Sequence, residues 1–158
     1  SDDQWMPNKI TEQVGFMEKN KLDFTYTNYS TFKNKNILNK IAPPTVFDFK
    51  SFIKNTSICT SSMMITSNYA KKYKFTKTKI CEDYFYKCCL LKKLKNAHCL
   101  NLFLTKYRIR KKSLQSNNLR NFYWIWKINK NYNQLSLLEN FISLISITFN
   151  SIKKYGFK

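Results

Sequence analysis

The sequence lacks the residues that build metal clusters and disulfide frameworks. It has one histidine, His98, and five cysteines, of which Cys88 and Cys89 are adjacent and none forms a CxxC pair. A structural zinc site needs four thiolate or imidazole ligands in paired spacings. The composition therefore excludes a zinc module, and the odd number of cysteines predicts reduced, half-buried thiols typical of a cytosolic protein.

Long apolar runs are also missing. The most apolar stretch, residues 135–149, contains Glu139 and Asn140, and it is shorter than the ~20 apolar residues that span a bilayer. The chain opens on Ser1 and two acids, without an initiator methionine or a signal peptide. The sequence therefore predicts a cytoplasmic protein whose start looks like a cut, with peripheral attachment at the inner face of the plasma membrane left open.

Acidic residues are scarce, at nine against 28 basic residues, which gives a net charge of +19. Only Arg108, Arg110 and Arg120 are arginines, and the other basic residues are lysines. A field of this sign attracts nucleic acid, anionic lipid head groups and phosphorylated small molecules alike. The abundance of Lys, Asn, Ile, Tyr and Phe is also what AT-rich coding favours, so the charge alone names no partner.

What the sequence does contain is enough for a folded core. Hydrophobic residues make up 43% of its 158 residues, and a chain of this length can bury roughly 70% of its unfolded surface. The periodicity predicts helices over residues 7–20, 46–54, 114–132 and 135–152, a short helix after residue 65, and a helix beginning at residue 82. It predicts strands over residues 22–29 and 57–65, one or two strands over residues 97–107, and a loop over residues 32–44. This alternation indicates an α/β domain with a helical tail.

Two segments rich in polar groups lie where ligands are expected. Asp2 and Asp3 stand at an expected strand end, ahead of the turn into the first helix, and α/β sheets place ligand sites at such ends. Two carboxylates there can hold a divalent cation that neutralises a diphosphate, or they are simply a solvated acid pair. Thr60, Ser61 and Ser62 offer hydroxyls in the expected second strand, either to a ligand or only to fill a tight strand.

A second acid pair, Glu82 and Asp83, opens the helix that follows residue 81. Acids at this position stabilise a helix by ~0.3–1 kcal/mol each, so helix stabilisation alone is an alternative explanation for the pair. On this helix the apolar stripe contains Tyr84, Cys88 and Leu91. The lysines at positions 87, 92, 93 and 95 are expected to form its exposed face.

In their order along the chain, these segments resemble the inverting family 2 glycosyltransferases. Residues 2–10 are similar to the Asp-x-Asp-Asp-x-Trp-x-Pro-x-Lys-(Leu/Ile) segment of that family, with its first Asp absent. Residues 82–84 are similar to its Glu-Asp-(Tyr/Trp) motif. Residues 107–113 are similar to its Tyr-Arg-x-His-x-x-Ser segment, with Arg110 in place of the histidine, and an arginine cannot ligate a metal.

The resemblance implies the C-terminal part of a GT-A (Rossmann-like) domain. Residues 1–115 would be its acceptor-side half, without the N-terminal nucleotide-binding part, and residues 116–158 a C-terminal helical extension. The implied activity is sugar transfer from a nucleotide-diphosphate sugar to a glycan or lipid-linked acceptor in bacterial cell-surface polysaccharide synthesis. The 158 residues alone are expected to be inactive.

The resemblance also implies the role of each site residue. Asp83 would be the general base that takes the proton of the acceptor hydroxyl, because an alkoxide-like nucleophile needs a positioned base at neutral pH, and Glu82 would orient Asp83 or the acceptor. Asp2 and Asp3 would bind a divalent cation (Mg or Mn) and the diphosphate. Three basic residues would stabilise the departing diphosphate, and four residues would bind the acceptor. The basic residues are Arg108, Arg110 and Lys111; the acceptor residues are Trp5, Thr60, Ser61 and Ser62.

Two other functions stay open. Lysines interleaved with Tyr and Trp are compatible with a nucleic-acid-binding module, but the sequence has no RNA-binding signature or arginine-rich face, so nucleic acid is not the expected partner. The last two helices are compatible with a membrane-surface scaffold. Their apolar stripe with terminal lysines is suited to an anionic membrane, although we prefer to place it in the core. The stripe contains Leu138, Phe141, Ile145 and Phe149, followed by Lys153 and Lys154.

Overall fold

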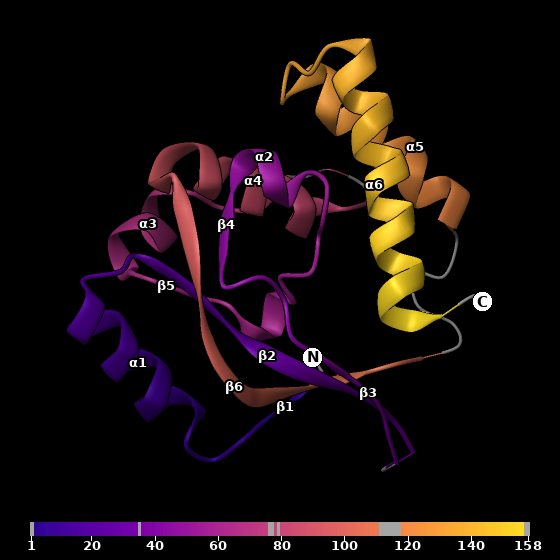
Figure 1. Cartoon of the computed structure of the whole chain (residues 1–158). Coiled ribbons are helices and arrows are strands. Elements are labelled where there is room, and N and C mark those ends of the chain that lie inside the picture. Colours follow the sequence, from indigo (N-terminus) through magenta and orange to yellow (C-terminus); the bar gives the residue numbers. More distant parts are fainter. Residues whose placement is uncertain (1, 35, 76–77, 79, 111–117, 157–158) are drawn as a thin grey trace.

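A computed structural model describes residues 2–34, 36–75, 78, 80–110 and 118–156, and it is organised around one mixed sheet (Figure 1). Its two central strands, β2 (Phe24–Lys33) and β6 (Asn96–Arg108), are parallel. All the other pairings are antiparallel. Strand β6 pairs with β1 (Gln4–Trp5) and β4 (Val46–Asp48), and β2 pairs with β3 (Asn36–Ile41) and β5 (Met64–Ile65).

Helices lie around this sheet. In Figure 1, α1 lies on one side of strands β2 and β6, α2 and α4 lie on the other, and the long pair α5 and α6 stands at the end remote from α1. The α/β class predicted from the sequence is confirmed. The helices are α1 (Lys9–Asn20), α2 (Phe49–Phe52), α3 (Ser67–Lys72), α4 (Glu82–Leu94), α5 (Asn118–Asn131) and α6 (Leu137–Tyr155), with a 3-10 turn η1 (Thr60–Ser62).

The core is aromatic and runs from β2 into the helices. Every residue of β2 except the last is buried, as expected of a strand covered on both faces. The ring of Tyr26 packs against Phe47, Phe47 against Phe52, and Phe52 against Tyr84, with centroids 5.7 to 5.9 Å apart. The Tyr26 hydroxyl donates a hydrogen bond to the carbonyl of Pro44 at 2.5 Å, so the one polar atom of this ring is paired.

The helical tail shares this core. Ile125 and Ile128 of α5 and Ile147 of α6 belong to the same buried cluster as Phe24 and Tyr26. The expected boundary between residues 115 and 116 lies outside the described residues, and the division into two domains stays a prediction. All five cysteines are free thiols, as predicted.

The expected loop over residues 32–44 is wrong, because residues 36–41 form strand β3. The neighbouring strand β2 supplies their hydrogen-bond partners, and Asn34 makes the turn with φ 49°, a left-handed conformation that asparagine tolerates. Lysines and asparagines suited to a solvated sheet edge were mistaken for loop residues. Pro43 and Pro44 follow the strand and do not interrupt it.

The expected strand over residues 57–65 is also largely wrong. The backbone N–H of Ser62 and its hydroxyl both donate to the carbonyl of Cys59, at 3.0 and 2.8 Å, and this local pairing makes the turn η1. Serine side chains commonly compete with strand pairing in this way. Only Met64–Ile65 pair as a strand. Likewise, only Phe49–Phe52 of the expected helix over residues 46–54 are helical, after strand β4.

The apolar stripe of α6 does not lie in the core, which corrects the preferred interpretation. Leu138, Phe141, Ile145 and Phe149 are 55 to 71% exposed. The opposite face is the buried one, because its polar side chains are hydrogen-bonded inside the protein. Among the residues that the structure describes, no helix is long and apolar enough to cross a bilayer.

Candidate active site

The turn η1 holds together the acids that the sequence singled out. Thr60 donates its hydroxyl hydrogen bond to Oδ2 of Asp83 at 3.0 Å. The next residue, Ser61, donates its hydroxyl hydrogen bond to Oδ2 of Asp3 at 2.5 Å. The two acidic motifs, which are 80 positions apart in the numbering, thus meet through two consecutive hydroxyls. The sequence predicted both sets of residues, but not the contact between them.

Asp83 lies in the first turn of α4, and its side chain is 29% exposed. Its Oδ2 also accepts a hydrogen bond from Nζ of Lys87 at 3.0 Å. Lys87 in turn donates to Oγ1 of Thr60 at 2.8 Å. The carboxylate, ammonium and hydroxyl therefore form a closed triangle that fixes one carboxylate oxygen and leaves part of the side chain accessible.

Lys87 is a residue that sequence reasoning misplaced. It was expected on the exposed face of α4, yet its side chain is only 4% exposed. The reason is charge compensation: a buried ammonium is tolerated when it is paired and hydrogen-bonded. The signal that could have found it is the i, i+4 spacing of Asp83 and Lys87, which brings opposite charges together on a helix.

Two opposing effects act on the pKa of Asp83. Burial raises the pKa, but the positive charge of Lys87 and the hydrogen bonds from Lys87 and Thr60 lower it, and the net effect is a pKa below the usual value. The carboxyl group is therefore ionised at neutral pH, as a proton acceptor must be.

The acids of the first segment face the end of strand β6. Oδ1 of Asp3 accepts the backbone N–H of Arg108 at 2.9 Å. Oδ2 of Asp2 lies 2.6 Å from Nε of Arg110 and 3.8 Å from Nε of Arg108. The antiparallel pairing of β1 with β6 produces this arrangement. Asp2 and Asp3 thus stand directly before the short edge strand β1.

These oxygens decide whether a divalent cation fits the site. Within the described parts of the chain, no three His, Cys, Asp or Glu side chains gather as metal ligands. Asp2 and Asp3 nevertheless provide the hard carboxylate oxygens that Mg²⁺ prefers, and Mg²⁺ is often held by one or two carboxylates together with substrate phosphates. The acid pair has the right chemistry for a cation that arrives with a diphosphate.

Trp5, the last residue of β1, contacts the same turn. Its Nε1 donates to the carbonyl of Ser61 at 2.8 Å, while the side chain remains 55% exposed. The Lys9 ammonium lies over the Trp5 ring, 4.4 Å from its centroid. An exposed indole held at one edge is a suitable platform for the face of a sugar ring.

Lys9 and Gln13 are a buried polar pair that the sequence reading did not find. Both are completely buried, and Nζ of Lys9 donates to Oε1 of Gln13 at 2.7 Å. The Gln13 amide then donates to Thr25 and to the carbonyl of Ser62, both at 3.1 Å. Burial lowers the pKa of Lys9 to about 8. The apolar side chains of Ile10 and Val14 on the same helix are exposed instead, because α1 packs its polar side onto the site.

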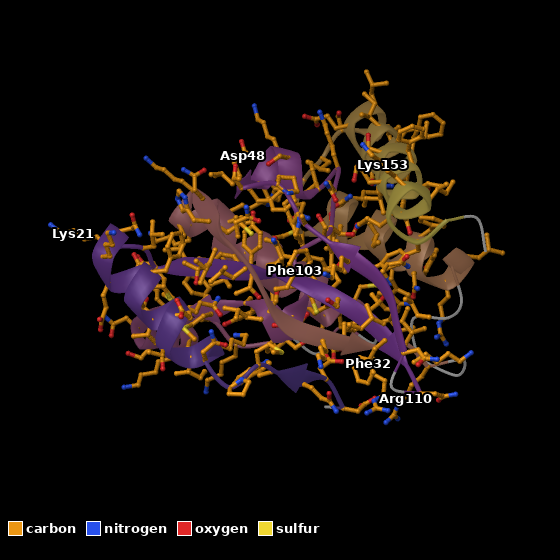
Figure 2. The ribbon with its side chains drawn as sticks, turned by 60° about the horizontal axis from the view of Figure 1, so that its bottom comes forward. Lys21, Phe32, Asp48, Phe103, Arg110 and Lys153 are labelled. Atoms are coloured by element: carbon orange, nitrogen blue, oxygen red, sulfur yellow. The ribbon has the colours of Figure 1, made fainter. Side chains whose placement is uncertain are left out.

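A groove of about 620 Å³ opens beside the Asp2–Arg110 pair. The guanidinium of Arg108 stacks on the ring of Phe32 at its wall, 4.6 Å from the centroid. Figure 2 shows Phe32 and Arg110 at the same end of the molecule, far from Lys21. The lining combines cationic and apolar side chains, which suits a ligand with phosphate groups. It is formed by Gln4, Phe32, Asn34, Ile37, Lys106 and Arg108.

Two of the predicted site residues, Ser62 and Glu82, lie apart from these contacts. Ser62 is completely buried and its hydroxyl donates to Cys59, so in this conformation it cannot contact an acceptor. Glu82 is exposed at the first residue of α4. Lys111 lies outside the described residues. The structure therefore brings together Asp83, Thr60, Ser61, Asp3 and Trp5, with Asp2, Arg108 and Arg110 at the neighbouring strand end.

Comparisons with known proteins identify relatives over most of the chain. No family model matches it. It is 27% identical over 161 residues to the UDP-Glc:alpha-D-GlcNAc-diphosphoundecaprenol beta-1,3-glucosyltransferase WfgD of Escherichia coli, which covers 99% of this chain and 62% of WfgD. It is 30% identical over 120 residues to WfaP of Escherichia coli, whose name states the same reaction, covering 76% of this chain and 47% of WfaP. The chain thus spans about three fifths of the length of one relative and about half of the other.

Proposed function

The chain is a family 2-like glycosyltransferase region, and on that premise we propose that it transfers a sugar from a nucleotide-diphosphate donor to a lipid-linked acceptor. The process would be the synthesis of a bacterial cell-surface polysaccharide. The donor would be a UDP-sugar and the acceptor a sugar on a diphospholipid, since WfgD and WfaP are named for such substrates.

One observation carries this proposal. Thr60 and Ser61, consecutive residues of η1, each donate a hydrogen bond to one of the two carboxylates, Asp83 and Asp3. The expected base and the expected diphosphate side are therefore neighbours, as a displacement reaction requires. The Trp5 indole is hydrogen-bonded to the carbonyl of Ser61 in the same turn. This position supports a role for Trp5 as a contact for the acceptor.

In the proposed reaction, Oδ of Asp83 accepts the proton of the acceptor hydroxyl. The acceptor oxygen forms a bond to the anomeric carbon while the bond from that carbon to the diphosphate breaks on the opposite face, so the anomeric configuration inverts. The lowered pKa of Asp83 keeps it ionised before the transfer. Lys87 does not touch the reacting atoms; it is a positioning residue that holds the carboxylate.

The departing diphosphate would meet the end of strand β6. Arg108 and Arg110 carry the cationic groups there, and both lie against Asp2. Asp2, with Asp3, would hold a Mg²⁺ or Mn²⁺ ion, and such an ion supplies charge neutralisation to a leaving diphosphate. The arginines would add charge-assisted hydrogen bonds to the same phosphate oxygens.

The placement of this region in a larger enzyme is part of the proposal. We regard the mixed sheet as part of a Rossmann-like GT-A domain, located in the cytoplasm, with attachment to the inner face of the plasma membrane. We also propose that the 158 residues alone do not complete a transfer, since the matched relatives are longer. Sugar transfer by these 158 residues in isolation would contradict that last point.

The test is a transfer assay on the protein as its gene encodes it. UDP-glucose and a GlcNAc-diphospholipid are supplied with Mg²⁺ or Mn²⁺, and the linkage formed is determined by nuclear magnetic resonance. We expect a β-linked product from the α-linked donor sugar. An α-linked product would contradict the inverting mechanism, and the absence of any transferred sugar from a panel of UDP-sugars would contradict the proposed function.

A further inference from the structure

We propose that the outward face of α6 docks on an anionic lipid bilayer. The face consists of five apolar side chains that are 41 to 71% exposed and recur every three or four residues, so they share one side of the helix. They are Leu138, Phe141, Ile142, Ile145 and Phe149. A contiguous apolar face of this kind on a protein surface marks an interaction site.

Polar contacts on the inner side of α6 fix this orientation. Ser143 is completely buried, and its hydroxyl donates to the carbonyl of Ile53 at 2.6 Å. Asn140 donates its amide hydrogen bond to the carbonyl of Trp126 at 3.1 Å and accepts one from Asn129 at 3.2 Å. A rotation that buried the apolar face would leave these groups unpaired, at a cost of about 1–3 kcal/mol each. The helix is therefore held with its apolar side outward.

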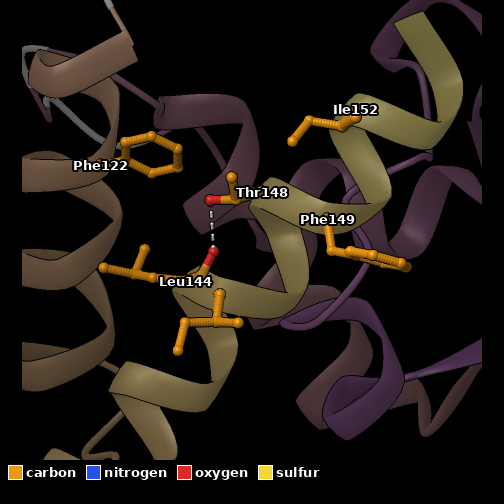
Figure 3. A pocket seen from close by; sticks show the side chains of 6 residues that line it. Phe122, Leu144, Thr148, Phe149 and Ile152 are labelled. Carbon is orange, nitrogen blue, oxygen red and sulfur yellow. Dashed lines mark hydrogen bonds between the residues drawn. The ribbon is translucent and has the colours of Figure 1, made fainter. Parts of the chain in front are cut away.

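The apolar face continues into a groove between α5 and α6. The groove encloses about 440 Å³ and is lined by Phe122, Leu144, Ile145, Thr148, Phe149 and Ile152 (Figure 3). The one hydroxyl in it, that of Thr148, donates to the carbonyl of Leu144 at 2.9 Å (Figure 3). The polarity of that hydroxyl is thus satisfied within the helix, and the groove presents a surface suited to hydrocarbon.

The net positive charge of the helical tail favours a bilayer over a second copy of the chain. Residues 118–156 contain one acid, Glu139, against five basic residues. Lys127 and Lys130 are exposed on α5, and Lys153 is exposed at the end of α6. Two copies that met through this face would bring like charges together, whereas an anionic bilayer attracts them. The choice also rests in part on the proposed lipid-linked acceptor, whose sugar would be presented at a membrane surface.

Vesicle sedimentation tests the proposal on the protein as its gene encodes it. The probes are vesicles of phosphatidylcholine alone and of phosphatidylcholine with phosphatidylglycerol. The variant Phe141→Gln/Ile145→Gln/Phe149→Gln removes the apolar face, and Ile10→Gln/Leu38→Gln/Val46→Gln is the control, since its three positions are 42 to 48% exposed elsewhere on the molecule. We expect wild type to bind the anionic vesicles, the first variant to bind them at least about tenfold more weakly, and the control to bind like wild type.

Three results would overturn the proposal. They are failure of wild type to bind anionic vesicles, wild-type binding by the α6 variant, and a dimer in sedimentation equilibrium that the α6 variant abolishes. Circular dichroism shows whether each variant keeps its helices. The failure of the proposed function would look different: Asp83→Asn would bind vesicles like wild type, and transfer to a water-soluble acceptor analogue would be absent in every protein, including wild type.

Discussion

Nζ of Lys87 lies 3.0 Å from Oδ2 of Asp83, one helical turn earlier on α4, and the lysine side chain is 4% exposed. Thr60 contacts both groups. A general base in a protein has two requirements: its carboxylate must be ionised, and it must point in a fixed direction. Lys87 provides both through charge and hydrogen bonding, while the partial exposure of Asp83 leaves room for a substrate.

Removal of the Lys87 charge should change the pH dependence of transfer. In Lys87→Met, burial of Asp83 is no longer opposed by the ammonium, so its pKa should rise and the acid limb of the pH–rate profile should move to higher pH. Lys87→Arg keeps the charge and should move the limb less. Lys93→Met, at an exposed position on α4, is the control, and an unchanged limb in Lys87→Met would contradict the positioning role.

The buried ammonium of Lys9 should make stability depend on pH. Burial lowers its pKa from 10.5 to about 8, so between these values the unfolded chain binds more protons than the folded one, and stability rises with pH. The free energy of unfolding of wild type, minus that of Lys9→Met, should increase by about 2 kcal/mol between pH 7 and pH 9.5.

Urea denaturation at the two pH values measures this difference. Lys19→Met changes an exposed lysine in the last turn of the same helix, and its stability should follow the same pH dependence as wild type. A Lys9 difference that stays flat or falls with pH would show that the lysine is not held charged in a dry site.

Asn129 should be the main polar tie between the helical tail and the α/β part. It is completely buried; its amide oxygen accepts from Tyr84 at 2.7 Å, and its amide nitrogen donates to Asn140 and Ser143, both at 3.2 Å. Asn129→Leu leaves these groups unpaired and should lower the free energy of unfolding by about 2–4 kcal/mol. Asn131→Leu, at an exposed position, should change it by less than about 0.5 kcal/mol. Equal effects of the two substitutions in thermal or urea unfolding would refute this role.

Much of the fold followed from local signals in the sequence. The helix that begins at Glu82 was predicted from its stripe and its first-turn acids, and strand β6 from its composition. Strand β3 was missed because its hydrogen-bond partners come from β2, and no local pattern of Lys and Asn residues reports a neighbouring strand. Turn η1 was taken for a strand because apolar and hydroxyl residues suit both, and only side-chain hydrogen bonds decide between them.

The sequence predicted most of the residues of the site, but not the hydrogen bonds between them. Motif order named Asp83, Asp3 and Thr60 without their contacts, since residues 23 or more positions apart meet only in the fold. The burial of Lys87 and Lys9 was not predicted. In a chain with a charge of +19, lysines are expected on the surface, and composition does not show which of them are paired inside.

The substitution Asp83→Asn tests the central claim most directly. Asparagine keeps the shape of the side chain and an oxygen that Thr60 and Lys87 can reach, but it cannot accept the acceptor proton. With the fold unchanged by circular dichroism, kcat for sugar transfer by the gene product should fall by about 100- to 10,000-fold, while Glu82→Gln should lose far less. Transfer by Asp83→Asn at the wild-type rate would contradict the account.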